Sequence, residues 1–239
     1  MDRSKAVARF TRMEDGTKED YEIIERVQQP FVHEIADRIL EHLSCLSGSY
    51  GGMLVDRLTH SLQTATRAHR DGRDEEYVVC ALLHDIGDML ASHNHADLAA
   101  AILKPFVSER NLWIVEHHAI FQGYYFWHHL GANRNAREKY RDHPYFADTA
   151  EFCALYDQCS FDPDYDTLPI AYFEPMLRRV FAVPKGPSAE PDGSSGRRSG
   201  GGDRADHGVY DAVVLEVSAL HADVRPAFVE GAALREKAI

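Results

Sequence analysis

The chain has 239 residues, 44% of them hydrophobic, which is enough for one well-packed domain with some chain to spare. Lys and Arg number 26 against 38 Asp and Glu, giving a net charge of −12. Because nucleic acid and anionic membranes repel such a chain, these two classes of partner are excluded and small molecules are expected instead.

The four cysteines are scattered without a C-x-x-C pair, which predicts neither a disulfide framework nor a thiolate zinc site. The first 20 residues hold no apolar signal core, and no window approaches the roughly 20 apolar residues that span a bilayer. We therefore expect a soluble, cytoplasmic protein.

Helical spacing of apolar residues predicts an all-α fold, with no strand pattern before residue 183. In the first run, residues 21–43, Pro30 either starts a second helix or kinks the first. The Gly- and Ser-rich residues 45–52 indicate a loop. Further helices are expected over residues 53–70, 74–91, 95–106, 108–131, 146–161 and 168–181.

Composition divides the chain near Val183. Residues 1–182 are predicted to form the helical domain, and residues 183–206, rich in Gly, Ser and Pro, are typical of a flexible linker. Residues 207–239 form a tail that is too short for a core of its own.

The most informative stretch is residues 78–90, where His84 and Asp85 stand side by side in an apolar helical run. An ionised carboxylate buried there would cost several kcal/mol unless something paired with it. A metal ion is the simplest partner, which predicts further ligands in the other helices.

Four more candidates lie among apolar neighbours on separate helices: His60, His95, His118 and Asp157. His93 and His117 stand beside two of them, so which histidine of each pair points inward stays open. A lone buried histidine is usually a hydrogen-bonded core residue, and Asp157 alone could cap a helix. Together, however, four imidazoles and two carboxylates favour two adjacent metal ions with Asp85 bridging them.

This order of residues, His, then His-Asp, then His, His and Asp on successive helices, resembles the HD-domain superfamily over residues 48–182. The resemblance implies an HD-domain helical bundle around a dinuclear metal site. The superfamily contains both metal-dependent phosphohydrolases and mixed-valent diiron oxygenases.

Tyr50 points to the oxygenases. A tyrosine ten residues before the first histidine, as Tyr50 is before His60, is similar to the hydroxyphosphonate oxygenases, in which it occupies an iron until substrate arrives. The ligand set also resembles that of inositol oxygenase. The resemblance implies two irons and makes Tyr50 and Asp85 catalytic. One iron would be held by His60, His84, Asp85 and Asp157, and the other by His95, His118 and the bridging Asp85.

The sequence departs from the phosphonate enzymes in three features: Met53 replaces a glutamate, Gln122 replaces a lysine, and Ala154 and Leu155 stand where a basic residue is expected. Many hydrolases and inositol oxygenase have lysine where this chain has Asp88. These departures weaken the case for a phosphonate substrate.

Residues 121–129 are unusually aromatic. Helix packing would explain them. Alternatively, some of these rings line the substrate pocket and, with Asp88, bind a quaternary ammonium group by cation–π contact. The predicted substrate-binding residues are Asp88, Gln122, Tyr125 and Trp127.

Three functions remain open. The first is a diiron oxygenase that uses O2 to cleave a small hydroxylated substrate, a phosphonate or a quaternary ammonium compound. The second is a phosphohydrolase using Mn, Co or Zn on a nucleotide or phosphate monoester, with Arg134 or Arg137 contacting phosphate. If the chain is not a phosphohydrolase, those arginines belong to a solvated helix face. The third is a metal-stabilised binding module without catalysis.

Overall fold

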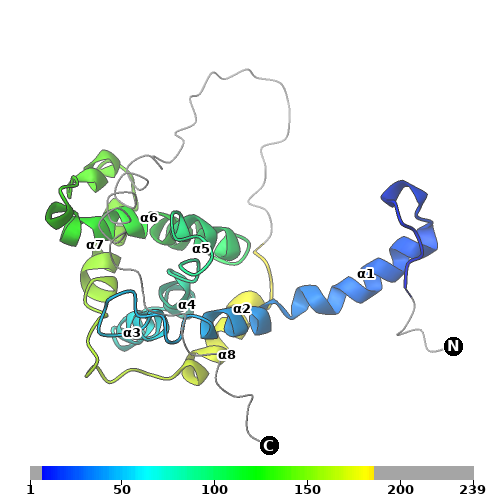
Figure 1. Cartoon of the computed structure of the whole chain (residues 1–239), viewed down its shortest axis with the longest axis horizontal. Helices are drawn as coiled ribbons and strands as arrows, with labels where there is room; N and C mark the ends of the chain where they lie inside the picture. The colour runs from blue at the N-terminus through cyan, green and yellow to red at the C-terminus, as the bar shows by residue number, and fades with distance from the viewer. Residues whose placement is uncertain (1–6, 186–239) are drawn as a thin grey trace, which may run out of the picture.

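Helix α4 (Glu75–Leu83) lies at the centre of the molecule, and all of residues 77–83 are buried (Figure 1). The structure, a computed structural model, describes residues 7–185. The other helices of the body are α2 (Ile35–Ser44), α3 (Arg57–Arg70), α5 (His95–Leu103), α6 (Glu109–Phe126), α7 (Phe146–Phe152) and α8 (Ile170–Phe181). No strand occurs within the described residues, which confirms the predicted all-α fold.

Three helices pack on α4. Helices α3, α6 and α8 all contact it, and α5 and α7 both pack on α6. The continuous apolar sequence of α4 is consistent with this position, since a helix covered on all sides has no polar face. Each fully buried Val or Leu of α4 contributes about 1.5–3 kcal/mol to folding.

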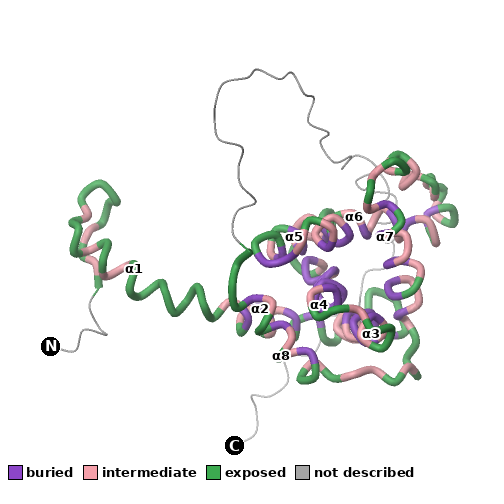
Figure 2. Tube along the Cα trace, turned by 180° about the vertical axis from the view of Figure 1, so that it is seen from behind, coloured by how far each residue is buried: buried purple, intermediate pink, exposed green. Residues whose placement is uncertain are grey.

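Helix α1 (Lys18–His33) projects from the body, and none of its residues is buried (Figure 2). It begins with a capping box between Thr17 and Asp20. Pro30 lies inside this helix rather than at the start of the next one, and the chain leaves helical hydrogen bonding only after His33. Helix α2 then begins at Ile35, five residues later than a start at Pro30 would put it.

The predicted helix over residues 74–91 is wrong at its end, because α4 stops at Leu83. His84 to Leu90 form a series of turns in which Ile86 N–H donates to the carbonyl of Leu83 and Asp88 N–H to that of Asp85. His42 of α2 also donates a ring N–H to the carbonyl of Ile86. The pair His84 and Asp85 (the HD pair) therefore lies just beyond the end of α4, so its side chains do not follow the spacing of a regular helix.

Two other predicted helices are divided. Ser108 caps α6 as expected, but α6 ends at Phe126 and continues as a 3-10 turn, Trp127–Leu130, that Gly131 ends with φ +76°. The expected helix over residues 146–161 is α7 followed by a π-helical turn, η5 (Cys153–Asp157). Such turns are frequent at functional sites, and this one places Asp157.

The loop before α3 is longer than predicted. Helix α3 begins at Arg57 instead of Met53, with the carboxylate of Asp56 accepting the N–H of Thr59. Gly51 and Gly52 have φ of +54° and +84°, a backbone conformation that keeps the preceding residues out of the helix. Tyr50 thus sits in a loop that runs to Asp56.

None of the helices in the described part of the chain is long and apolar enough to span a membrane. The predicted linker, residues 183–206, and the predicted tail, residues 207–239, lie outside the described residues apart from residues 183–185. The division into these segments stays a prediction.

Candidate metal centre

The three histidines His60, His84 and His118 are each anchored to a backbone carbonyl through Nδ1. His60 Nδ1 lies 3.0 Å from the carbonyl oxygen of Ser160, His84 Nδ1 2.8 Å from that of Ala81, and His118 Nδ1 2.6 Å from that of Val115. Because a carbonyl only accepts, each Nδ1 carries the proton. In a neutral ring the free Nε2 lone pair then points away from the backbone, ready to bind a metal.

Packing adds to this orientation. His60, His84 and His118 are 5%, 0% and 2% exposed, respectively. The ring of His60 stacks on Phe161, with 4.4 Å between centroids, and the ring of His84 meets Phe152 edge-on. These rings therefore have little freedom to rotate, and the direction of each Nε2 atom is fixed before any ion binds.

The Nε2 atoms converge in pairs. His60 Nε2 lies 3.1 Å from His84 Nε2, and His95 Nε2 lies 3.2 Å from His118 Nε2. Two lone pairs at this separation repel unless a positive charge lies between them. Each pair therefore has the arrangement expected of imidazoles that share one cation.

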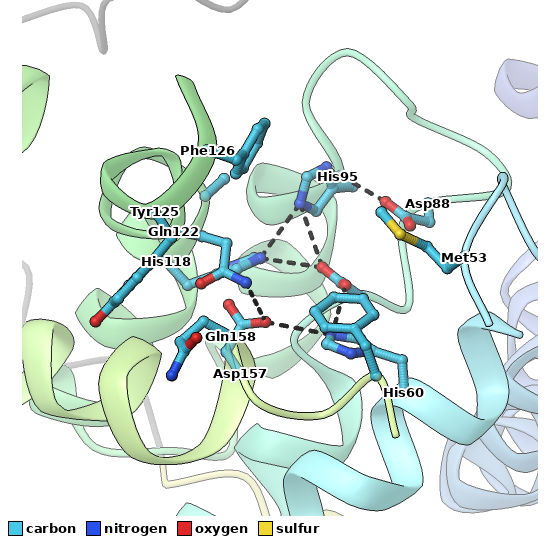
Figure 3. Close-up of a pocket in the computed structure, with 13 residues that line it drawn as sticks. Met53, His60, Asp88, His95, His118, Gln122, Tyr125, Phe126, Asp157 and Gln158 are labelled. Carbon is cyan, nitrogen blue, oxygen red and sulfur yellow. Dashed lines mark hydrogen bonds and ion pairs between the residues drawn. The ribbon is translucent and has the colours of Figure 1, made fainter. Parts of the chain in front are cut away.

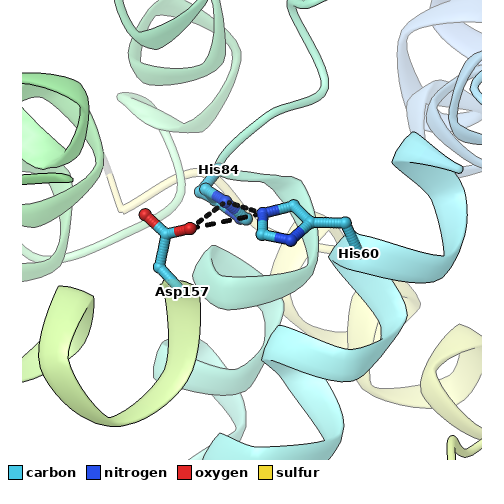
Figure 4. Close-up of side chains that lie close together, drawn as sticks. All are labelled: His60, His84 and Asp157. Carbon is cyan, nitrogen blue, oxygen red and sulfur yellow. Dashed lines mark hydrogen bonds and ion pairs between the residues drawn. The ribbon is translucent and has the colours of Figure 1, made fainter. Parts of the chain in front are cut away.

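Asp157 completes the first pair (Figure 4). Its Oδ1 lies 3.3 Å from His60 Nε2 and 3.7 Å from His84 Nε2, and it accepts a hydrogen bond from Gln122 Nε2. Its Oδ2 is buried and has no hydrogen-bond partner. A buried carboxylate oxygen without a donor is costly, and a metal ion would remove that cost, so the residues fit a metal.

Asp85 lies between the two pairs and gives one oxygen to each. Its Oδ2 is 3.4 Å from His60 Nε2 and 3.3 Å from His84 Nε2. Its Oδ1 is 3.0 Å from His118 Nε2 and 3.3 Å from His95 Nε2. This division of one carboxylate between two sets of imidazoles is the geometry of a bridging ligand for two ions.

The charges around the centre favour a cation. Burial alone would raise the pKa of Asp85, but the surrounding histidines, His84 foremost, hold it well below its usual range. Burial would likewise lower the pKa of His60, yet hydrogen bonds to Asp157 and Asp85 raise it to about 9. The two buried carboxylates thus stabilise positive charge beside His60, whether it is a proton on the ring or a metal ion in its place.

The six predicted ligands therefore come together: His60, His84, Asp85, His95, His118 and Asp157. Three overlapping groups among the described residues have ligand atoms close enough to hold an ion: His60 with His84 and Asp157, His84 with Asp85 and His118, and Asp85 with Asp88 and His95. His95 and His118 are thus the inward members of their pairs. His117 instead stacks on Trp113, with 3.9 Å between ring centroids.

A cavity of about 330 Å³ opens onto the centre (Figure 3). Besides the predicted ligands and Asp88, the cavity is lined by Met53, Ala119, Gln122, Tyr125, Phe126, Gln158 and Phe161. No Lys or Arg is among the described residues that line it. Gln122 and Tyr125 thus lie where a substrate-binding role requires, although that role stays a prediction.

Trp127 does not line this cavity. The ring is 2% exposed and packs on Gly123, so tightly that a Cβ atom at position 123 would lie 2.3 Å from it. Because α6 ends at Phe126, Trp127 turns into the core instead of continuing the cavity wall. The expectation that Trp127 faces the substrate pocket is not met by its position.

Tyr50 lines a smaller cavity of about 160 Å³ that shares His60, Asp85 and Asp88 with the larger one. The residue is 54% exposed. The structure therefore brings Tyr50, on the loop before α3, to the edge of the candidate metal centre. Its action on an iron stays a prediction.

Asp88 lines both cavities, but both of its oxygens contact protein cations or donors. Its Oδ2 accepts a hydrogen bond from Arg57 Nε at 2.8 Å, and its Oδ1 lies 3.4 Å from His95 Nδ1. Asp88 is thus less available for a cationic substrate than its sequence position suggests. Arg57 was missed by sequence reasoning, because 31 residues separate it from Asp88.

The basic run lies outside the cavity. Arg134 and Arg137 both stack on Tyr124, at 4.1 and 3.8 Å from the ring centroid. Neither is among the residues that line the two cavities. Their position favours a structural role over contact with a substrate at the metal centre.

Comparison with known proteins agrees with this geometry. Among curated proteins, none matches the chain. Residues 57–147 match the model of the HD domain family, a stretch that holds five of the six ligands and leaves out Asp157. Over these residues the chain is therefore similar to the HD domain.

Proposed function

We propose that this protein is a dinuclear iron oxygenase that uses O2 to cleave a small hydroxylated substrate. The ligand set of four imidazoles and two carboxylates suits iron, and Asp85 lies where it would bridge two ions. Bound iron would supply the redox chemistry, activating O2 and oxidising the substrate.

The protein's own residues would prepare the site. The backbone carbonyls of Ser160, Ala81 and Val115 keep the Nδ1 protons in place, so that the histidines offer only Nε2 to the ions. Gln122 holds Asp157 Oδ1 through its amide, which fixes the orientation of that carboxylate. Both effects preorganise the ligands.

The cavity wall would bind and shield the substrate. Tyr125, Phe126 and Phe161 give it an aromatic surface that excludes water from the centre. A volume of about 330 Å³ is at the lower end for small-molecule sites and suits a compact substrate. Tyr50, at the adjoining cavity, would act as the gate that leaves when the substrate binds.

The observation that carries the choice of an oxygenase is the lining of the larger cavity. A phosphate monoester or nucleotide brings about two negative charges, which protein sites usually meet with Lys or Arg. None of the described lining residues of that cavity is Lys or Arg. A neutral or cationic substrate is therefore the better match.

A metal-dependent phosphohydrolase is the second candidate, because one observation favours it. Arg57 lines the smaller cavity next to Asp85, so one guanidinium lies near the position of the ions. Two ions with a bridging ligand would also suit hydrolysis, since they can activate water and stabilise a leaving oxygen. Arg57 is, however, already bound to Asp88.

The experiment is to purify the protein under anaerobic conditions, count its iron, and record the electron paramagnetic resonance spectrum after partial oxidation. We expect two irons per chain and a mixed-valent signal. O2 consumption is then measured with a panel of small hydroxylated compounds, including phosphonates and quaternary ammonium compounds.

His95→Ala is the informative variant, because it should leave one iron and abolish the mixed-valent signal. Asp166→Asn, at a carboxylate 91% exposed and paired with Arg70, is the control and should keep both. Release of phosphate from nucleotides with Mn²⁺ or Co²⁺, together with no O2 consumption by the iron form, would instead establish the hydrolase.

A further inference from the structure

His95 differs from the other three histidines of the centre in what faces its Nδ1 atom. His60, His84 and His118 each donate Nδ1–H to a neutral backbone carbonyl. His95 Nδ1 instead lies 3.4 Å from the carboxylate oxygen Oδ1 of Asp88 (Figure 3). A carboxylate behind an imidazole orients the ring and makes its other nitrogen a stronger metal ligand.

Asp88 is itself held in place. Its side chain is 18% exposed, and its Oδ2 accepts the Nε–H of Arg57 at 2.8 Å. The guanidinium of Arg57 thus fixes the orientation of the carboxylate whose other oxygen faces His95.

Arg57 continues the chain of contacts to the loop that carries Tyr50. Its Nη1 donates to the hydroxyl of Ser49 at 2.8 Å and to the carbonyl of Ser49 at 3.3 Å. Gly51 lies against the same guanidinium, since a Cβ atom there would be 3.0 Å from Nη1. One arginine therefore contacts both sides of Tyr50 and the carboxylate behind His95.

We propose that Asp88 is a positioning residue that orients His95 for the second metal ion, and that Arg57 links this contact to the Tyr50 loop. The inference rests on the two-ion centre of the proposed function, but not on its redox chemistry. The ion bound by His95 and His118 thus depends on Asp88, whereas the ion bound by His60, His84 and Asp157 does not.

The geometry argues against a direct role of Asp88 as a ligand or as a site for a substrate cation. His95 turns Nε2, not Nδ1, toward His118 and Asp85, so an ion between those groups lies on the far side of the ring from Asp88. The other Asp88 oxygen is bound by Arg57. Positioning is the role that uses both contacts.

The test is a titration of the metal-free protein with Co²⁺, followed by the absorption bands of the bound ion. The wild-type chain should bind two ions. Asp88→Asn should weaken one of the two sites about 10- to 100-fold and leave the other unchanged. At saturating Co²⁺ its spectrum should match the wild type, because the donor atoms to the ions are the same.

Arg57→Gln should weaken the same site by a smaller factor, since Asp88 remains. The double variant should be no weaker than Asp88→Asn alone, because Arg57 acts through Asp88. Asp166→Asn, which breaks the exposed ion pair with Arg70, is the matched control and should bind as the wild type does. Circular dichroism checks that each variant keeps its helices.

Several outcomes would overturn the proposal. Two sites of unchanged affinity in Asp88→Asn would show that Asp88 does not support His95, and equal weakening of both sites would remove the proposed selectivity. An altered spectrum at saturation would make Asp88 a direct ligand. If Asp88→Asn does not fold, unchanged binding by Arg57→Gln refutes the link. None of these results depends on O2 consumption, so a failure of this proposal can be told apart from a failure of the proposed oxygenase function.

Discussion

Gly87 lies so close to His95 that a Cβ atom at position 87 would come within 2.5 Å of the His95 carbonyl oxygen. The same atom would lie 2.9 Å from His95 Cα. The turn after His84 and Asp85 therefore packs directly on the backbone of a predicted metal ligand. This contact is backbone against backbone and leaves no side chain that could move aside.

Gly87→Ala should therefore displace His95. We expect the variant to lose about 1–3 kcal/mol of stability, as overpacking does, and to bind one metal ion instead of two. Metal content after dialysis and urea unfolding measure the two effects. Gly123→Ala, which crowds the Trp127 side chain instead of a ligand backbone, is the control: it should lose stability but keep two ions. Two tightly bound ions in Gly87→Ala would contradict the prediction.

Asp85→Asn should break the bridge. The amide keeps one carbonyl oxygen but presents an NH2 group where the second carboxylate oxygen lies, so it serves one set of imidazoles at most. We expect metal content to fall to one ion or fewer per chain, and any mixed-valent signal to disappear. Elemental analysis and electron paramagnetic resonance decide this, and a variant that holds two ions would show that Asp85 does not bridge.

Trp127→Ala should act on stability and not on the metal centre. The ring is 2% exposed, and its removal leaves a cavity in the core, so we expect a loss of about 3–5 kcal/mol in the free energy of unfolding. Metal content and tetramethylammonium affinity should be unchanged. If the variant kept wild-type stability but bound tetramethylammonium more weakly, Trp127 would belong to the substrate site after all.

Glu76 should make the fold sensitive to acid. Its carboxylate accepts hydrogen bonds from the Ser108 backbone N–H at 2.7 Å and from Asn111 Nδ2 at 2.8 Å, and pairs with Lys185. Burial would raise its pKa, but these contacts lower it below the usual 4.5. Its contribution is therefore complete above about pH 4.5 and is lost as the pH falls through the lowered pKa.

The variant Glu76→Gln tests that contribution. It keeps the shape but loses the charge, and we expect it to be about 1–2 kcal/mol less stable than the wild type at pH 7. Between pH 7 and pH 3 its stability should fall less than that of the wild type. Parallel urea unfolding curves for the two chains over this range would argue against a role for the ionised carboxylate.

Much of the centre follows from the sequence, because the chemistry limits where its residues can lie. His84 and Asp85 in an apolar run need a partner, and successive helices of a bundle bring one ligand each to a shared interior. These rules led to six residues that the structure brings together, although their role as ligands stays a prediction. The all-α fold followed from the same apolar periodicity.

The details that failed depend on contacts between distant residues. Apolar spacing continues past Leu83, so nothing local indicates that α4 ends there, where the chain meets α5 through Gly87 and His95. The direction of Trp127 depends on where α6 stops, and an aromatic run gives no signal for that. Arg57 and Asp88 meet only because α3 packs on α4.

The carbonyl contacts of His84 and His118 have a further consequence. Each ring is bonded to the carbonyl three residues earlier in its own chain, within or at the end of a helix that the core holds rigid. The orientation of these ligands is thus a property of the local backbone and not of any bound ion. In contrast to a zinc finger, which folds around its ion, this chain would offer a preformed metal site, and ions could exchange without refolding of the protein.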